Sequence, residues 1–277
     1  MAELKMRPSR VLRKLRAGEV VCMAKLNTAD ARVAEIAAQA GFDCLWACLE
    51  HVPNSIEVIE RQIMVGKAYD VDTMVRVSRG GYSDYIRPLE MDAAGIMVPH
   101  IMSLKDAKWV VRTTRFHPIG RRPVDGGNAD GAYCGIEFNE YLRQANEQRF
   151  IGIQIEDPEP LDELEEIVAL EGIDMIFFGP GDFSQSIGAP GQWDHPLIDQ
   201  TRRRVAELCR KHGKCAATPG SPDNLQSLID MGYTALNMCA DVVGLFQYFN
   251  GIAADVRKVI PDFGKETAAG GMYGKLR

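Results

Sequence analysis

The stretch FIGIQIEDPEPLDELEEIVALEGIDMIFFGPGD, residues 150–182, decides the fold. It opens at 150–155 with a nearly continuous apolar run, which is typical of a strand buried on both faces. Apolar residues at helical spacing then predict a helix over 161–171, and Gly172 stands where a C-cap glycine belongs. Residues 174–178 return to strand character. Because a right-handed crossover leaves both strands parallel and adjacent, the stretch predicts a β-α-β unit.

A carboxylate follows each of these two strands. Glu156 and Asp182 should therefore point to the same end of a parallel sheet. Magnesium and manganese typically take one or two protein carboxylates and fill their other positions with water and substrate oxygens. The Gly179-Pro180-Gly181 turn carries little side-chain bulk, so backbone N–H groups can approach an anionic ligand. Glu156 and Asp182 could instead be acids that cap helices, and the pattern alone leaves both interpretations open.

The alternation of strand and helix continues along nearly the whole chain. Strands are predicted at 20–26, 44–50, 73–78, 95–101, 150–156, 174–178, 214–218 and 234–239. Helices are predicted at 29–40, 55–69, 83–93, 103–114, 161–171, 196–212, 222–231 and 241–259. Eight strand–helix pairs are what a TIM-type (β/α)8 barrel requires, and the 277 residues match its usual length of about 250. We therefore predict a single α/β barrel domain over residues 1–261.

Three segments lie outside this alternation. The basic, amphipathic residues through Arg16 predict an extra N-terminal surface helix. The connection at 115–149 is far longer than an ordinary loop, and we expect either a flap over the site or an arm against another subunit. Residues 262–277 have little apolar content and predict a flexible C-terminal tail.

Composition excludes several classes of function. The net charge is −6 and no basic patch is interleaved with aromatic residues, so we expect no nucleic-acid partner. No apolar run is long enough to span a bilayer, so we expect no membrane association. The seven cysteines are an odd number without C-x-x-C spacing, which favours reduced thiols in a cytoplasmic protein.

An arginine and a glutamine lie within predicted strands. Arg76 has apolar neighbours, and a buried guanidinium needs a planar anion. That anion is either a substrate carboxylate or an acid of the barrel interior, Glu50 or Glu156. Gln154 lies two residues before Glu156 and so points to the same side of its strand, where it orients a substrate oxygen or satisfies the arginine.

Two further strand-end residues carry possible chemistry. His51 lies just past a strand end, and because the histidine side chain is in general suited to proton transfer near neutral pH, it is the candidate general acid or base. Lys25 lies at another strand end, where a desolvated lysine forms a Schiff base with a carbonyl substrate. The carboxylate pair favours metal-assisted chemistry over this imine route.

Several motifs together resemble one family. They are L-E-H-V-P-N at 49–54, M-V-R-V at 74–77, G-I-M-V-P at 95–99, Q-I-E at 154–156 and E-G-I-D-x-I-F-F-G-P-G-D-F-S at 171–184. Over residues 18–250 the chain resembles the HpcH/HpaI aldolases, which are class II, metal-dependent pyruvate aldolases. Members include 4-hydroxy-2-oxoheptanedioate aldolase and 2-dehydro-3-deoxyglucarate aldolase.

The resemblance implies roles for individual residues. Glu156 and Asp182 match the family's ligands for a divalent cation, which is magnesium, manganese or cobalt. Arg76 matches the arginine that steadies the pyruvyl carboxylate and the enolate oxygen, and Gln154 matches a glutamine of the same pocket. His51 matches the acid/base histidine. The turn at 179–181 matches the backbone that receives the substrate carboxylate.

The chain also departs from the family pattern near the histidine. Cys48 replaces an acid, and Glu90 falls where members often have an aspartate thought to polarise the histidine. These changes leave the metal and pyruvate half of the site intact and alter the half that transfers protons.

The resemblance implies retro-aldol cleavage of a 4-hydroxy-2-oxo acid to pyruvate and an aldehyde, by a homo-oligomer that is a hexamer or a trimer. Two alternatives stay open. One is decarboxylation of oxaloacetate, which needs the same enolate but no base on a hydroxyl group. The other is a barrel that binds an oxo acid without turnover.

Overall fold

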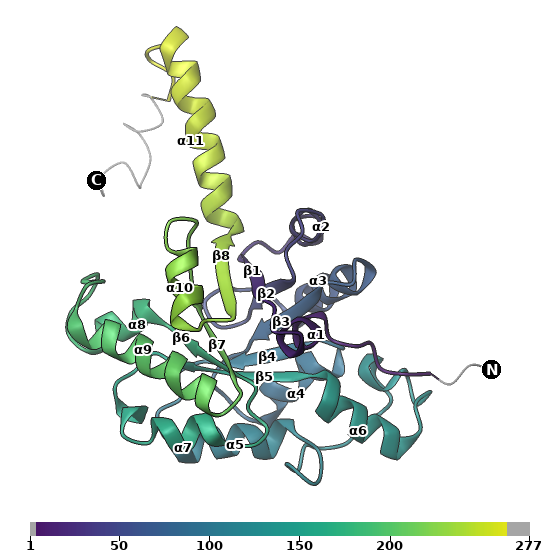
Figure 1. Cartoon of the computed structure of the whole chain (residues 1–277). Helices are drawn as coiled ribbons and strands as arrows, with labels where there is room; N and C mark the ends of the chain where they lie inside the picture. Colours follow the sequence, from purple (N-terminus) through teal and green to yellow (C-terminus); the bar gives the residue numbers. More distant parts are fainter. Residues whose placement is uncertain (1–3, 265–277) are drawn as a thin grey trace.

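Eight parallel strands close into a barrel in which each strand pairs with the next along the chain and the last pairs with the first (Figure 1). This computed structural model describes residues 4–264. The strands are β1 (Val21–Leu26), β2 (Cys44–Cys48), β3 (Asp72–Arg76), β4 (Gly95–Val98), β5 (Phe150–Ile155), β6 (Met175–Phe178), β7 (Cys215–Pro219) and β8 (Ala235–Ala240). The predicted TIM barrel is confirmed, with strand ends displaced by three residues at most.

The strands are buried on both faces, which explains their continuous apolar runs. Side chains that face the inside, such as Met23, Met74 and Phe177, form one apolar cluster. Side chains that face outward, such as Ile96 and Ile153, pack in a second cluster beneath the surrounding helices.

Most helices follow the predicted pattern. They are α2 (Ala31–Gln39), α3 (Ile56–Ala68), α4 (Tyr82–Glu90), α5 (Leu104–Thr114), α7 (Leu164–Ala169) after the short η2 (Glu159–Leu161), α9 (Pro196–Lys211) and α10 (Leu225–Met231). The short helix α8 (Pro180–Ser186) was not predicted. The N-terminal helix α1 (Arg10–Arg16) is also present. It is more than a surface helix, because Val11 and Leu12 are buried against the interior cluster and close the amino end of the barrel.

The long connection before β5 lies at the amino end of the barrel, because α5 ends there and β5 begins there. It contains η1 (Ala129–Gly131) and a helix, α6 (Phe138–Gln148), that sequence periodicity did not predict. The segment contacts the N-terminal residues: the Met6 N–H donates to Gln144 Oε1 at 2.8 Å, and Arg16 donates to the Glu147 carbonyl at 2.7 Å. The expected flap over the catalytic end is therefore wrong, whereas an arm against another subunit stays a prediction.

The last helix, α11 (Asp241–Val259), has the predicted bounds but does not cover its own barrel. It has no buried residue and stands away from the strands (Figure 1). None of the helices in residues 4–264 is long and apolar enough to cross a membrane. Of the tail expected at 262–277, only residues 262–264 fall within the described part of the chain.

Candidate active site at the carboxyl end of the barrel

Glu156, just past the end of β5, is the most tightly held acid of the site. Its Oε2 accepts a hydrogen bond from Gln154 Nε2 at 2.6 Å, and its Oε1 accepts one from the His100 backbone N–H at 3.0 Å. Only 1% of Glu156 is exposed. A Cβ at Gly179 would lie 2.5 Å from Glu156 Oε2, so a glycine is needed for the next strand end to approach this carboxylate. Both oxygens are thus fixed in direction.

Asp182, in the first turn of α8, is the second predicted ligand. Its side chain makes no hydrogen bond or ion pair within residues 4–264. Burial raises the pKa of Glu156 to about 7, and the negative charges of Asp182 and Glu50 add to the shift against the opposing effect of His100. Three carboxylates therefore act on one another at this end of the barrel, and no lysine or arginine of residues 4–264 forms an ion pair with Glu156 or Asp182.

These side chains fit a hard divalent cation. No group of three or more His, Cys, Asp or Glu side chains in residues 4–264 is arranged to hold a metal ion by itself. A site of one or two carboxylates is what magnesium and manganese use when water and substrate supply the remaining oxygens. Gln154 Oε1 is buried without a hydrogen-bond partner in the described structure, and it adds an uncommitted oxygen beside Glu156.

The predicted turn at 179–181 is the start of α8. The Gly179 N–H donates to the Ile155 carbonyl at 3.1 Å, and Pro180 has no N–H. First-turn N–H groups have no partner inside their helix, so Gly181 and Asp182 keep theirs for another acceptor. The backbone donors expected from the turn are therefore fewer than the sequence indicated.

Glu50 joins the groups of β2, β3 and β4. Its Oε2 lies 3.0 Å from Arg76 Nε, and the Arg76 guanidinium also donates to Cys48 Sγ at 3.2 Å. Of the two ion pairs that the sequence left open for Arg76, the structure forms the one with Glu50. Arg76 is only 4% exposed, so its guanidinium lies inside the barrel mouth and not at the surface.

His51 is brought to the same cluster. Its Nε2 lies 3.4 Å from Glu50 Oε2, and its ring is half exposed. A histidine with one face in solvent and a carboxylate behind it has the arrangement of an acid/base group.

His100 is a neighbour to which the sequence assigned no role. Its Nδ1 lies 2.8 Å from Asp157 Oδ2, and its Nε2 lies 3.7 Å from Glu50 Oε1. Burial alone would lower the pKa of His100, but the hydrogen bond to Asp157 and the charges of Glu156 and Glu50 raise it overall. The sequence carried a signal, because His100 follows Pro99 at a strand end and Asp157 follows Glu156.

Glu90 is the candidate that the structure does not bring to this cluster. It ends α4 and lines a pocket on the outside of the barrel with Glu60, Asn128 and Tyr133. Burial raises its pKa against the opposing charge of Arg122. Within one chain Glu90 has no contact with His51, so its role there stays a prediction that needs a second copy.

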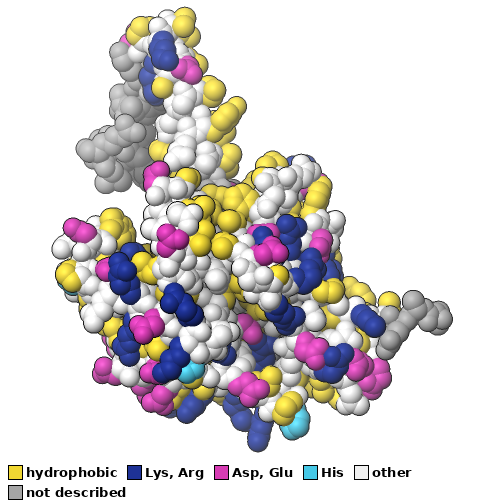
Figure 2. Space-filling view, in the orientation of Figure 1, with side chains coloured by type: hydrophobic (Ala, Val, Ile, Leu, Met, Phe, Trp, Pro, Cys, Tyr) yellow, Lys and Arg dark blue, Asp and Glu magenta, His cyan; other side chains and the backbone are white. Residues whose placement is uncertain are grey.

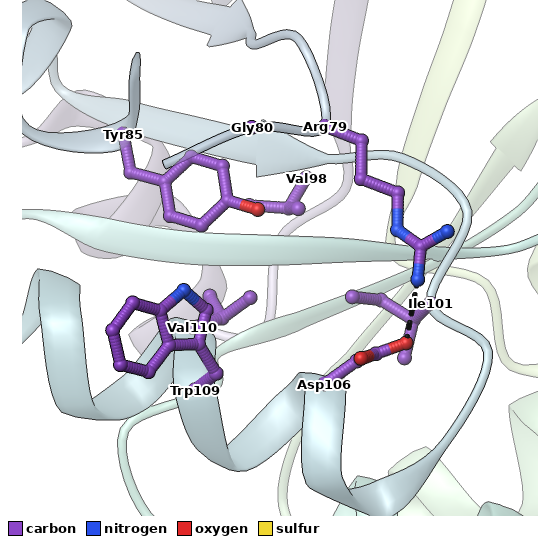
Figure 3. Close-up of a pocket in the computed structure, with 8 residues that line it drawn as sticks. All are labelled: Arg79, Gly80, Tyr85, Val98, Ile101, Asp106, Trp109 and Val110. Atoms are coloured by element: carbon purple, nitrogen blue, oxygen red, sulfur yellow. Dashed lines mark hydrogen bonds and ion pairs between the residues drawn. The ribbon is translucent and has the colours of Figure 1, made fainter. Parts of the chain in front are cut away.

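Another pocket lies outside the barrel, between β4, α4 and α5 (Figure 3). It measures about 350 Å³, and an ion pair of 2.8 Å between Arg79 and Asp106 closes one side, opposite the rings of Tyr85 and Trp109. None of the predicted site residues lines it. The chemistry therefore belongs to the barrel mouth.

A closed parallel barrel with converging polar groups at the carboxyl ends of its strands defines the class of TIM-barrel enzymes. Residues 22–245 match the family model of the HpcH/HpaI aldolase/citrate lyase family. The chain belongs to this family, as its motifs predicted. Membership also confirms the predicted reaction class, that of a carbon–carbon lyase of the aldolase type.

Individual relatives agree with this assignment. A 2-keto-3-deoxy-L-rhamnonate aldolase from Escherichia coli is 32% identical over 220 residues, which cover 79% of this chain and 82% of that protein. The crystal structure of an HpcH/HpaI aldolase from Desulfitobacterium hafniense matches with a TM-score of 0.83 and 25% identity, over 89% of this chain and 96% of that one. A family member from Burkholderia cenocepacia has a TM-score of 0.82 and 28% identity, over 90% and 99% of the two chains.

Proposed function

We propose that this chain is a divalent-metal-dependent aldolase that cleaves a 4-hydroxy-2-oxo acid to pyruvate and an aldehyde. The observation that carries the proposal is the carboxylate of Glu156, buried and fixed through both oxygens, beside an Asp182 that has no ionic partner in the described structure. Glu156 and Asp182 would hold magnesium, manganese or cobalt. The cation would supply positive charge that stabilises an enolate when the C3–C4 bond breaks.

Arg76 and Gln154 orient the pyruvyl half. The Arg76 guanidinium is buried at the mouth with Glu50 on one side, and its planar fork suits a carboxylate or an enolate oxygen. Gln154 holds Glu156 through its Nε2 and has an unpartnered Oε1. The N–H groups of Gly181 and Asp182 are further donors for the substrate carboxylate.

His51 is the group that we assign to proton transfer. It would take the proton of the C4 hydroxyl as the carbon–carbon bond breaks, which releases the aldehyde. Glu50, at 3.4 Å from its Nε2, stabilises the protonated imidazole. The pyruvate enolate is then protonated at C3.

The test is deuterium exchange at the methyl group of pyruvate, followed by NMR with added magnesium or manganese and again with EDTA. We expect exchange that depends on the metal, because the enolate forms without any aldehyde present. Absence of exchange with metal present, although pyruvate binds, would contradict the aldolase and favour a decarboxylase without the proton relay or a barrel that binds an oxo acid without turnover.

Decarboxylation of oxaloacetate is the second candidate, because Cys48 stands in place of an acid. The sulfur of Cys48 accepts a hydrogen bond from Arg76. This reaction needs the enolate but no base at a hydroxyl group. Equal rate losses in both reactions on His51→Ala would show that His51 is not the hydroxyl base.

We also propose that the protein is a homo-oligomer, a hexamer or a trimer, assembled through α11. Apolar side chains line this helix and its base (Figure 2). They include Val243, Leu245, Phe246, Phe249 and Ile252, all of them exposed in the single chain. Apolar patches of this kind mark interfaces in soluble proteins.

Light scattering after gel filtration should give a multiple of 30.7 kDa, and the double substitution Phe246→Asp and Phe249→Asp should lower the mass. A wild-type chain that elutes as a monomer would contradict this part of the proposal.

The free thiols fit the reducing cytoplasm, where we expect the protein to act.

A further inference from the structure

Lys25 is a charged side chain of the barrel mouth to which the mechanism gives no task. Inward-facing residues alternate along β1, and Val21 and Met23 belong to the interior cluster. Lys25 is the next inward position, and its Cα pairs with that of Trp46 on β2. Its ammonium group therefore lies inside the mouth, above the apolar layer.

Lys25 shares the ring of Trp46 with a second cation, Arg76. Its Nζ lies 5.2 Å from the centre of the Trp46 ring, and the guanidinium of Arg76 lies 5.0 Å from the same ring. Burial lowers the pKa of Lys25, and the charge of Arg76 lowers it further. Within residues 4–264 Lys25 forms no ion pair. The charges of Glu50 and Asp182 do reach Lys25 and raise its pKa, but Glu50 is paired with Arg76 and Asp182 is a proposed metal ligand.

The acid that follows β8 is also committed elsewhere. Asp241 accepts hydrogen bonds from the Asn27 N–H at 2.8 Å and from the Thr28 N–H and hydroxyl at 2.9 and 2.6 Å. These bonds fix the loop directly after Lys25. Trp46 gives a second sign of a missing acceptor, because it is 4% exposed and its Nε1 has no hydrogen-bond partner in the described structure.

Trp46 alone is a weak partner for Lys25. A cation–π contact at a partly exposed site is worth about 0.5–1 kcal/mol. A hydrogen bond between an ammonium and an anion contributes about 1.5–3 kcal/mol. Two cations over one indole ring therefore favour an anion between or beside them.

The order of strands places this anion relative to pyruvate. Glu156 follows β5, which is four strands from β1 in either direction around the closed barrel, and Arg76 on β3 lies midway. In the proposed function the pyruvyl half occupies the side from β3 to β6. The aldehyde half then extends toward β1 and β2.

We infer that Lys25 is a specificity-determining residue that binds an anionic group, carboxylate or phosphate, on the aldehyde half of the substrate. This inference rests on the proposed function and names its substrate class. Arg76 and the metal ligands recognise the oxo acid, whereas Lys25 with the Trp46 N–H selects its partner.

The experiment measures kcat/KM for aldol addition of pyruvate to two matched pairs of aldehydes. Succinic semialdehyde against butanal tests a carboxylate, and glyceraldehyde 3-phosphate against glyceraldehyde tests a phosphate. The variants are Lys25→Met and Lys25→Arg. Lys214→Met is the control, because Lys214 is also half-buried with a pKa lowered by burial, but it donates to the Leu170 and Ile173 carbonyls at the amino end.

We expect the wild type to prefer the anionic member of one pair, and the preferred pair identifies the anion. Lys25→Met should lower that preference about 10- to 100-fold, and Lys25→Arg should restore part of it. Lys214→Met should keep the wild-type preference.

Preference ratios that stay unchanged in Lys25→Met for both pairs, whatever happens to the individual rates, would overturn the inference. Inactivation of the wild type by borohydride with pyruvate would also overturn it, because Lys25 would then act through an imine. Pyruvate exchange by the wild type distinguishes failure of this inference from failure of the proposed function. Exchange with unchanged preference ratios would contradict only the role of Lys25. Absence of exchange would contradict the proposed function as well.

Discussion

The two ends of the barrel both carry buried charges, but the charges are paired differently at each end. At the amino end Asp72 pairs with Arg7 at 2.7 Å and accepts a hydrogen bond from the Val11 N–H at 2.9 Å. At the carboxyl end Arg76 does pair with Glu50, but Glu156 is close to two other carboxylates and Lys25 shares the Trp46 ring with Arg76. Breaking a closed buried pair destabilises the folded chain, because the remaining charge loses its partner, whereas like charges held together by the fold are arranged for a ligand.

The largest expected effect is at the carboxyl end. Glu156→Gln keeps the shape of the side chain and removes its charge, and we expect metal-dependent pyruvate exchange to fall on the order of 1,000-fold. The melting temperature without metal should stay the same or rise, because the buried carboxylate that is lost has a raised pKa. Calorimetry and NMR exchange on the same sample check both parts. Asp182→Asn should lose exchange to a similar extent, and substantial exchange in either variant would contradict the contrast between the two ends.

The next effect concerns the proton-transfer half. We expect His51→Ala to slow aldol cleavage about 100-fold or more, since general acid–base groups contribute about 10²–10⁴. Decarboxylation of oxaloacetate should fall much less, because it has no hydroxyl proton to remove. Steady-state rates of both reactions on one enzyme preparation give the comparison.

The amino end should show the opposite behaviour. Asp72→Asn leaves Arg7 without its buried partner, and we expect a loss of about 3–5 kcal/mol in the free energy of unfolding. Exchange per folded molecule should stay close to wild type. Urea unfolding measures the stability, and a stable variant with lost exchange would contradict the division of roles between the two ends.

The smallest effect is expected at His100. Its backbone lies in the left-handed region, with φ of 50°, which glycine adopts without strain. His100→Gly should therefore keep the N–H bond to Glu156 Oε1 while it removes the ring, and exchange should fall less than about tenfold. A loss as large as that of Glu156→Gln would show that the ring, not the N–H, supports the metal side.

The barrel and the edge with Glu156 and Asp182 could be predicted because they depend on local pattern. The apolar runs, the helix between them and the right-handed crossover together place both acids at one end. The pairing of His100 with Asp157 could not be predicted in this way. The two residues are 57 positions apart, and their contact requires the left-handed backbone at His100.

Two helices show other limits. α6 was missed because it lies in a polar insertion and buries only Tyr141, Gln144 and Ala145. The bounds of α11 followed from its pattern, but its direction did not, since none of its residues is buried within residues 4–264. Glu90 was proposed from its position in the family pattern. That position does not say whether the side chain reaches the site of its own chain or that of a second copy.

The most direct test of the contrast is the binding of Mn²⁺, counted by electron paramagnetic resonance on wild type, Glu156→Gln and Asp72→Asn. We predict one bound ion per chain in the wild type and in Asp72→Asn, and none in Glu156→Gln at the same free Mn²⁺ concentration. Equal binding by wild type and Glu156→Gln would contradict the claim that Glu156 and Asp182 form the metal site.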